Sequence, residues 1–268
     1  MTAPSLLPNW PPAHGLNTIH VPKAAAKMTL ASRIQIAAPP TTVFDILRNV
    51  SAYKEWNSLL PNGAITSQPH PHKSSDHHHH SSYDPTLLYL DTHFNLTITL
   101  SGQESTIPQI ASDFSTPKQP STYVSKDLLR DDGSWYQDLE RVHRVAWMTN
   151  EAEYLGDQFH SERFNEVIDL KGGKGGQERR NDDGKGGGNG KDKGGDALVE
   201  YRTWELSSGP RVEALVAAGL QPVVQKGLDQ LCVELKERSE MFAKGDGEAG
   251  RGGHTGDVVP GAPGFVGP

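Results

Sequence analysis

Cysteine, long apolar runs and blocks of like charge are scarce or missing in this 268-residue chain. The single cysteine, Cys232, cannot form an internal disulfide, so nothing indicates an oxidising compartment. No apolar run approaches the ~18 residues that a membrane-spanning helix needs, which argues against stable membrane insertion. The formal net charge is −7, and without a basic block the chain lacks the electrostatic signature of a nucleic-acid or anionic-membrane partner.

Core-forming residues are also scarce, but mainly in three segments. Hydrophobic residues make up 35% of the chain and the mean hydropathy is −0.57. Residues 68–86 carry six histidines among Ser, Pro and Asp, residues 171–195 contain eleven glycines, and residues 244–268 are rich in Gly and Pro. Such sequence buries too little apolar surface to offset its ordering entropy. We therefore expect a His-rich insert, a Gly-rich insert and a disordered tail.

Residues 1–27 are expected to form a disordered leader. Pro4, Pro8, Pro11 and Pro12 interrupt every apolar pair, so the segment has no signal-peptide core. It contains no acidic residue, which is typical of a mitochondrial transit peptide, but it also lacks arginine, which is not. The expected location is cytoplasmic, with mitochondria as the alternative.

The remaining sequence predicts a strand, two short helices, a series of strands and a long helix. Leu30, Ile34 and Ile36 alternate with other residues in a strand pattern, and Thr41 is a suitable N-cap for the first helix. The second short helix is expected at 51–56, further strands at 93–100, 121–129, 141–149, 160–170 and 197–206, and the long helix at 222–243. Because no helix-length segment separates these strands, the sheet is expected to be antiparallel.

Several residue strings in this order resemble one superfamily. They are IQIAAPP at 34–40, VFDIL at 43–47, Tyr53 with the WN pair at 56–57, RVAW at 144–147, and GLDQL at 227–231. Together they are similar to the SRPBCC (START-like) superfamily, in particular its polyketide cyclase/dehydrase branch, also described as coenzyme Q-binding START-like. The resemblance implies a helix-grip α+β domain over residues 28–243. In that fold a curved antiparallel sheet of about six or seven strands surrounds a long C-terminal helix.

The members of this superfamily share an internal cavity and not a chemistry, so the resemblance implies a binding function first. The expected partner is an apolar small molecule: a lipid, a polyketide or an isoprenoid-like compound. One alternative is a polyketide cyclase, aromatase or dehydratase that uses polar residues of the same cavity. Further alternatives are a quinone carrier and a protein-interaction version of the fold. No cofactor is expected, the catalytic residues are unknown, and enzymatic activity and oligomeric state stay open.

Polar residues on the predicted strand faces are the candidate site. In each strand they alternate in step with large apolar residues, so an inward-facing strand would place both kinds in the cavity. If the faces point outward instead, these polar groups meet water or pair with one another. Tyr53 lies where the family closes its cavity mouth, and the last helix presents an apolar face. The expected ligand-binding residues are His143, Trp147, His160, Glu162, Phe164, Arg202, Trp204, Leu228, Leu231 and Tyr53.

Two conspicuous segments are not expected to bind ligands. The histidines between His70 and His80 have metal-binding side chains, but Ser, Pro and Asp flank them without an anchor to the core. We therefore assign no metal site. The Gly-rich insert matches neither G-x-x-x-x-G-K-[ST] nor G-x-G-x-x-G, so a phosphate-binding loop is excluded there.

Overall fold

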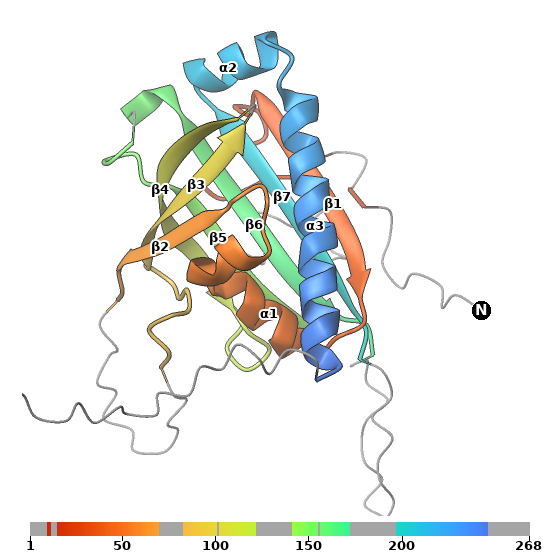
Figure 1. The fold of residues 1–268 in the computed structure, drawn as a ribbon. Coiled ribbons are helices and arrows are strands. Elements are labelled where there is room, and N and C mark those ends of the chain that lie inside the picture. The colour runs from red at the N-terminus through yellow and green to blue at the C-terminus, as the bar shows by residue number, and fades with distance from the viewer. Residues whose placement is uncertain are drawn as a thin grey trace, which may run out of the picture.

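The computed structural model describes residues 10–11, 15–69, 83–100, 102–121, 141–154, 156–171 and 197–245. Within these residues, a seven-stranded antiparallel sheet curves around one long helix (Figure 1). In their order across the sheet, the strands are β1 (Met28–Ile36), β7 (Val199–Ser208), β6 (His160–Asp169), β5 (Val142–Thr149), β4 (Gln103–Ser115), β3 (His93–Leu100) and β2 (Asn62–Ser67). The helices are α1 (Pro40–Arg48), α2 (Pro210–Ala217) and α3 (Gln221–Ala243), with 3-10 helices η1 (Val50–Glu55) and η3 (Gly156–Gln158).

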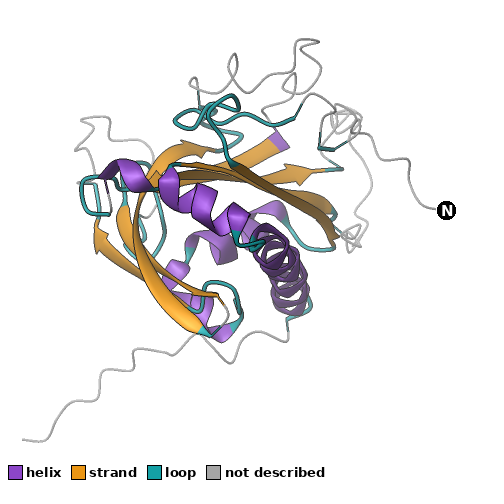
Figure 2. Cartoon of the chain, turned by 90° about the horizontal axis from the view of Figure 1, so that it is seen from above, coloured by secondary structure: helices purple, strands orange, loops and turns teal. Residues whose placement is uncertain are grey.

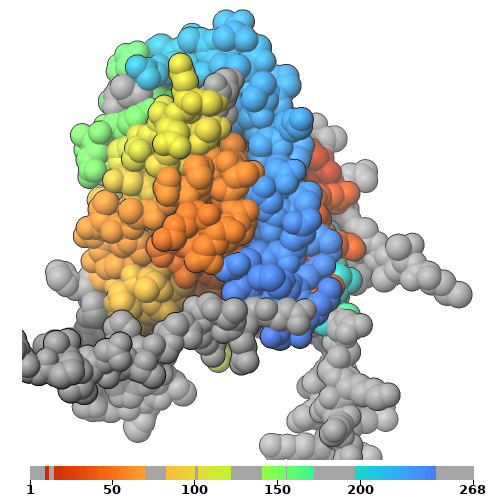
Figure 3. All heavy atoms as spheres, in the orientation of Figure 1, coloured from red at the N-terminus to blue at the C-terminus, as the bar shows by residue number. Residues whose placement is uncertain are grey.

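This element order and topology confirm the predicted helix-grip α+β fold. Seen from above, the strands form a curved wall with α3 on its inner side (Figure 2). In the space-filling view, α3 lies beside the surface formed by α1, η1 and β2 (Figure 3), and α1 and α3 are in contact. The buried residues of α3 recur at helical spacing, which explains why one face packs on the sheet: Val224, Leu228, Leu231, Cys232 and Leu235.

Two strands were not predicted. β2 lies between the predicted helix at 51–56 and the predicted strand at 93–100, where no element was expected. β4 begins with a polar stretch and contains Pro108, which usually argues against a central strand. Pro108 is tolerated here because β5 has already ended beside it. Gln109 pairs with Thr149 at the end of β5, and the Pro108 carbonyl accepts a hydrogen bond from the backbone N of Asn150 at 2.9 Å. The missing N–H therefore falls where the ladder between β4 and β5 ends.

Some of the predicted segments fall beyond the described residues. Of the expected strand at 121–129, only residue 121 is described, and it is not in a strand. Most of the inserts at 68–86 and 171–195 and of the tail at 244–268 also lie outside the described ranges. These expectations therefore stay predictions.

The outer face of the sheet is covered by residues 15–27, which we call the strap. Leu16 and Val21 of the strap are buried, together with Trp10, in a cluster with outward-facing residues of the central strands: Ala146, Phe164, Trp204 and Leu206. Trp204 Nε1 donates to the Asn17 carbonyl at 3.0 Å, and the Lys27 backbone N donates to the Ser207 carbonyl at 2.8 Å. The expectation of a disordered leader over 1–27 is thus wrong for its described part. A few apolar residues suffice because the sheet already presents them an apolar surface.

His20 anchors the strap to a buried carboxylate. Its backbone N donates to Glu162 Oε2 at 2.6 Å, and its ring Nδ1 lies 2.9 Å from Glu162 Oε1. Ser112 Oγ donates to the same Oε1 at 2.9 Å. The hydrogen bond with the Glu162 carboxylate raises the pKa of His20, although partial burial opposes the shift.

The packing of α3 can be tested by truncating one side chain. Leu228 is fully buried in a cluster with Met28, Leu30 and Phe159, whereas its neighbour Asp229 is exposed. We expect Leu228→Ala to lower the free energy of unfolding by about 2–5 kcal/mol and Asp229→Ala to change it little, both measured by urea unfolding. Equal losses at the two positions would contradict this placement of the helix.

The strap anchor predicts a pH-dependent contribution of His20 to stability. Because the folded state raises the pKa of His20, its stabilisation is complete below the unfolded value of ~6.5 and is lost as pH rises through the folded pKa. We expect His20→Ala to destabilise the protein more near pH ~5.5 than near pH ~8.5. The difference should not exceed ~1 kcal/mol, since the side chain is 41% exposed and solvent screens the pair. His93→Ala, which has no carboxylate partner among the described residues, is the control and should show no such trend. A pH-independent loss for His20→Ala would rule the charged anchor out.

Candidate ligand-binding cavity

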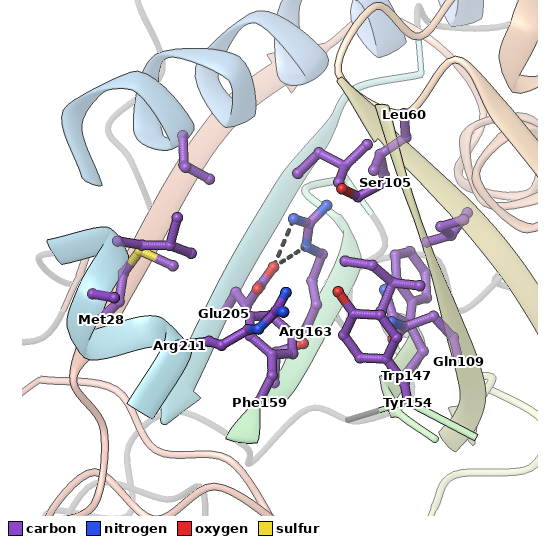
Figure 4. Close-up of a pocket in the computed structure, with 17 residues that line it drawn as sticks. Met28, Leu60, Ser105, Gln109, Trp147, Tyr154, Phe159, Arg163, Glu205 and Arg211 are labelled. Atoms are coloured by element: carbon purple, nitrogen blue, oxygen red, sulfur yellow. Dashed lines mark hydrogen bonds and ion pairs between the residues drawn. The ribbon is translucent and has the colours of Figure 1, made fainter. Parts of the chain in front are cut away.

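A cavity of about 360 Å³ lies between the inner face of the sheet, α2 and the first turns of α3. Its volume is at the lower end of the ~300–1,000 Å³ usual for small-molecule sites. The apolar part of its wall comes from six helices and strands and two loops around the space: Met28, Leu60, Leu96, Ile98, Ile107, Trp147, Phe159, Ala214, Leu215 and Val224. Ser105, Gln109, Tyr154, Ser161, Arg163, Glu205 and Arg211 complete it (Figure 4).

Strand alternation selects the residues that reach this cavity. Along β4, Ser105, Ile107 and Gln109 line it, and along β6 Ser161 and Arg163 do. Ser161 is small, and its Oγ forms a hydrogen bond with Thr149 Oγ1 at 2.9 Å, so it adds little bulk to the inner face.

The charged feature of the cavity is an ion pair between directly opposed residues of β6 and β7. Arg163 pairs with Glu205 across the two strands, with Nε 2.8 Å and Nη2 2.6 Å from Oε2 (Figure 4). Ser207 Oγ donates to the other carboxylate oxygen at 3.1 Å. Both oxygens of Glu205 are therefore engaged.

Arg163 keeps one donor without a partner. Its Nη1 is buried and makes no hydrogen bond within the described residues. Burial by itself lowers the pKa of this guanidinium, but the Glu205 carboxylate beside it more than compensates and the pKa is raised. The group is therefore a permanent cation, and a buried donor that makes no hydrogen bond costs about 1–3 kcal/mol. A ligand oxygen at this point would remove that cost.

Of the residues predicted from the sequence, Trp147 lines the cavity. Leu228 and Leu231 are buried on the inner side of α3, in the packed clusters beside the cavity. Tyr53 is fully buried and donates its hydroxyl to the Leu47 carbonyl at 2.6 Å, and its burial raises its pKa. His143 lies toward the α1 end of the sheet with its ring 5.2 Å from that of Phe44. Burial, followed by the charge of Arg48, lowers the pKa of His143.

The predicted inward direction of two strand faces is wrong. Glu162, Phe164, Arg202 and Trp204 point to the outer face. Glu162, Phe164 and Trp204 lie beneath the strap, Arg202 lies against the ring of Trp10, and Phe164 and Trp204 are stacked at 5.0 Å. His160 begins the same face of β6, and its Nδ1 lies 2.5 Å from Glu151 Oε1. Because the strap buries the outer face, the large apolar residues Phe164 and Trp204 stand on that side of β6 and β7, whereas the polar residues Arg163 and Glu205 face the cavity. Alternation then cannot tell which side faces the cavity, and a shift of one residue exchanges the two.

The cavity residues that the sequence analysis missed occupy the alternate positions of those same strands. Arg163 precedes Phe164 and Glu205 follows Trp204, so the assignment of the apolar residues to the inside assigned the ion pair to the outside. The signal that could have found them is the opposite charge of two residues that face each other across β6 and β7. That signal can be recognised only when the register of the two strands is already known.

The described ranges carry neither a metal-binding cluster nor a membrane-spanning helix. They contain no cluster of three or more His, Cys, Asp or Glu side chains that could hold a metal ion. The histidines at 70–80 lie outside those ranges. No helix among the described residues is both long and apolar enough to cross a membrane.

The similarity of this chain to known proteins is structural. No family model and no curated protein matches it. A hypothetical protein from Helicobacter pylori has a TM-score of 0.50 and 16% identity, with 84% of this chain and 97% of that chain covered. A START superfamily protein from Mycobacterium smegmatis has a TM-score of 0.42 and 14% identity, covering 80% and 98%. The Zhui aromatase/cyclase from Streptomyces sp. R1128 has a TM-score of 0.43 and 9% identity, covering 82% and 97%.

At such identities these likenesses concern the fold alone. The strand order and the long inner helix already described show that the chain has a helix-grip α+β fold. What a protein of this fold binds has to be argued from the side chains of its own cavity.

The ion pair in the cavity predicts a non-additive mutational pattern. Arg163→Met alone leaves a buried carboxylate without its cation and should cost about 3–5 kcal/mol of unfolding free energy. The double variant Arg163→Met with Glu205→Leu should cost less than either single change, since no unpaired charge remains. The exposed pair of Arg238 and Glu55 is the control, where Arg238→Met should cost no more than ~1 kcal/mol. Additive losses at Arg163 and Glu205 in urea unfolding would show that the pair is not coupled.

Proposed function

We propose that this protein binds an apolar small molecule in the cavity between the sheet and α2/α3. The observation that supports the proposal most directly is a mostly apolar space that no side chain of the described residues fills. Cores normally pack to near-crystalline density, because an empty volume forfeits dispersion contacts. A cavity of this size inside the fold is therefore better explained by an occupant than by imperfect packing.

The apolar wall favours ligands with a hydrocarbon or aromatic body. Trp147 and Phe159 offer flat aromatic surfaces, whereas Leu96 and Ile98 offer aliphatic ones. Lipids, isoprenoids and polyketide-type compounds all carry such a body, and the wall suits each of them.

The lining favours binding over acid–base chemistry, which the cyclase alternative requires. The cavity wall contains no histidine among its described residues, and both oxygens of its one carboxylate, Glu205, are held by Arg163 and Ser207. A general acid or base needs a free position within hydrogen-bond reach of the substrate. We therefore place the carrier or receptor function ahead of the enzyme.

Filling the cavity should abolish binding without unfolding the protein. Nile red, a neutral fluorescent probe, is expected to bind the native chain and to be displaced by fatty, isoprenoid or polycyclic aromatic compounds. Ile107→Trp adds bulk inside the cavity and should weaken probe binding about tenfold or more. Thr106→Trp places the same side chain one residue away on the exposed side of β4 and should leave binding unchanged. If both variants bind the probe like the unmodified protein, the cavity is not the binding site.

A further inference from the structure

The charge of the cavity wall differs in sign from that of the whole chain. The wall carries two cations, Arg163 and Arg211, and one anion, Glu205, which gives a net charge of +1. The whole chain has a formal net charge of −7. A positive site inside a negative protein is not expected from composition, so the surplus cation needs a local explanation.

The two arginines are available to a ligand in different ways. Arg163 is buried, and two of its nitrogens already bind Glu205, while Nη1 has no partner. Arg211 is exposed in the first turn of α2 and forms no ion pair within the described residues. In Figure 4 both guanidinium groups reach into the cavity, with Trp147 and Tyr154 across the space from them.

Glu205 cannot neutralise this surplus. Its Oε2 accepts from Arg163 and its Oε1 from Ser207. The next anion that enters the cavity would therefore meet the free Nη1 donor of Arg163 and the unpaired charge of Arg211. Charge-assisted hydrogen bonds of this kind are about twice as strong as neutral ones.

We propose that the natural ligand is an apolar carboxylate, with its hydrocarbon or aromatic body on the apolar wall and its carboxylate at Arg163 Nη1 and Arg211. This inference rests on the proposed binding function and narrows its ligand class. It reverses an ordinary preference: an apolar cavity without a cation binds a neutral ester better than the corresponding acid, because the carboxylate loses its hydration. Here the acid is preferred.

Matched pairs of acid and ester test this preference directly. Lauric acid with methyl laurate represents a chain-like body, and naphthoic acid with methyl naphthoate represents an aromatic one. Isothermal titration calorimetry on the full chain should give an affinity for the acid at least about tenfold above that for its ester in one of the two pairs. The pair that shows this preference tells whether the cavity accepts a chain-like or an aromatic ligand body.

Charge variants then assign the effect to the two arginines. Arg211→Gln should reduce acid binding several-fold and leave ester binding unchanged, and added salt should weaken acid binding in the unmodified protein because Arg211 is exposed. The double variant Arg163→Met with Glu205→Leu removes both buried charges of the cavity wall. It should abolish most of the preference for the acid over the ester that is left in Arg211→Gln. Arg33→Gln, at an exposed position of β1 outside the cavity wall, is the matched control and should change neither affinity.

The outcomes separate this inference from the function on which it rests. If the esters bind as tightly as the acids or more tightly, the carboxylate inference is overturned while the apolar-binding function stands. If neither acids nor esters bind and Nile red does not bind either, both fall together. A loss of acid preference in Arg33→Gln equal to that in Arg211→Gln would overturn the assignment to the cavity.

Discussion

The burial of both faces of the central strands is the constraint on which the rest of this structure depends. β5, β6 and β7 carry the inner core on one side and the strap on the other. Charges on the outer face are therefore enclosed, and enclosed charges need partners. Arg144 accordingly lies 2.6 Å from Glu166 and 3.3 Å from Asp113, and Arg202 is paired with Glu200 under the ring of Trp10.

On the inner face the same strands change character along their length. Val167 of β6 belongs to the packed core near α1, and Arg163 belongs to the cavity near α2. Between them Asn165 accepts from the Tyr201 hydroxyl at 2.8 Å and from Thr203 at 3.1 Å, and donates to the Val145 carbonyl at 3.2 Å. This buried network is satisfied by its own members, so it separates a packed end from a hollow end without needing a ligand. The cavity is thus a local feature of one end of the fold.

The sequence predicted the fold better than the site. In β3, the apolar residues Phe94, Leu96 and Ile98 alternate with polar residues. One face of such a strand is more buried than the other, so the alternation in the sequence is enough to identify the strand. β4 was missed because its exposed start and Pro108 remove that pattern, although its neighbours on both sides hold it in the sheet. Within the site, Trp147 lines the cavity, and its role in ligand binding stays a prediction. The inner and outer residues of β6 and β7 were exchanged.

The apolar face of α3 and most of the strands and helices, with the exception of β2 and β4, were determined by the sequence itself. They depend on local periodicity, which is readable from one chain. The direction of β6 and β7 was decided by tertiary structure, because the strap supplies an apolar cover from far away in the sequence and makes Phe164 and Trp204 core residues of the outer side. Arg163 and Glu205 are 42 positions apart in the sequence, and they pair because of the register between β6 and β7. The same register places the positive charge of Arg163 in the cavity wall. Only packing in three dimensions sets that register, since a slip of one strand by a single residue would turn its charge to the outer face and break the pair.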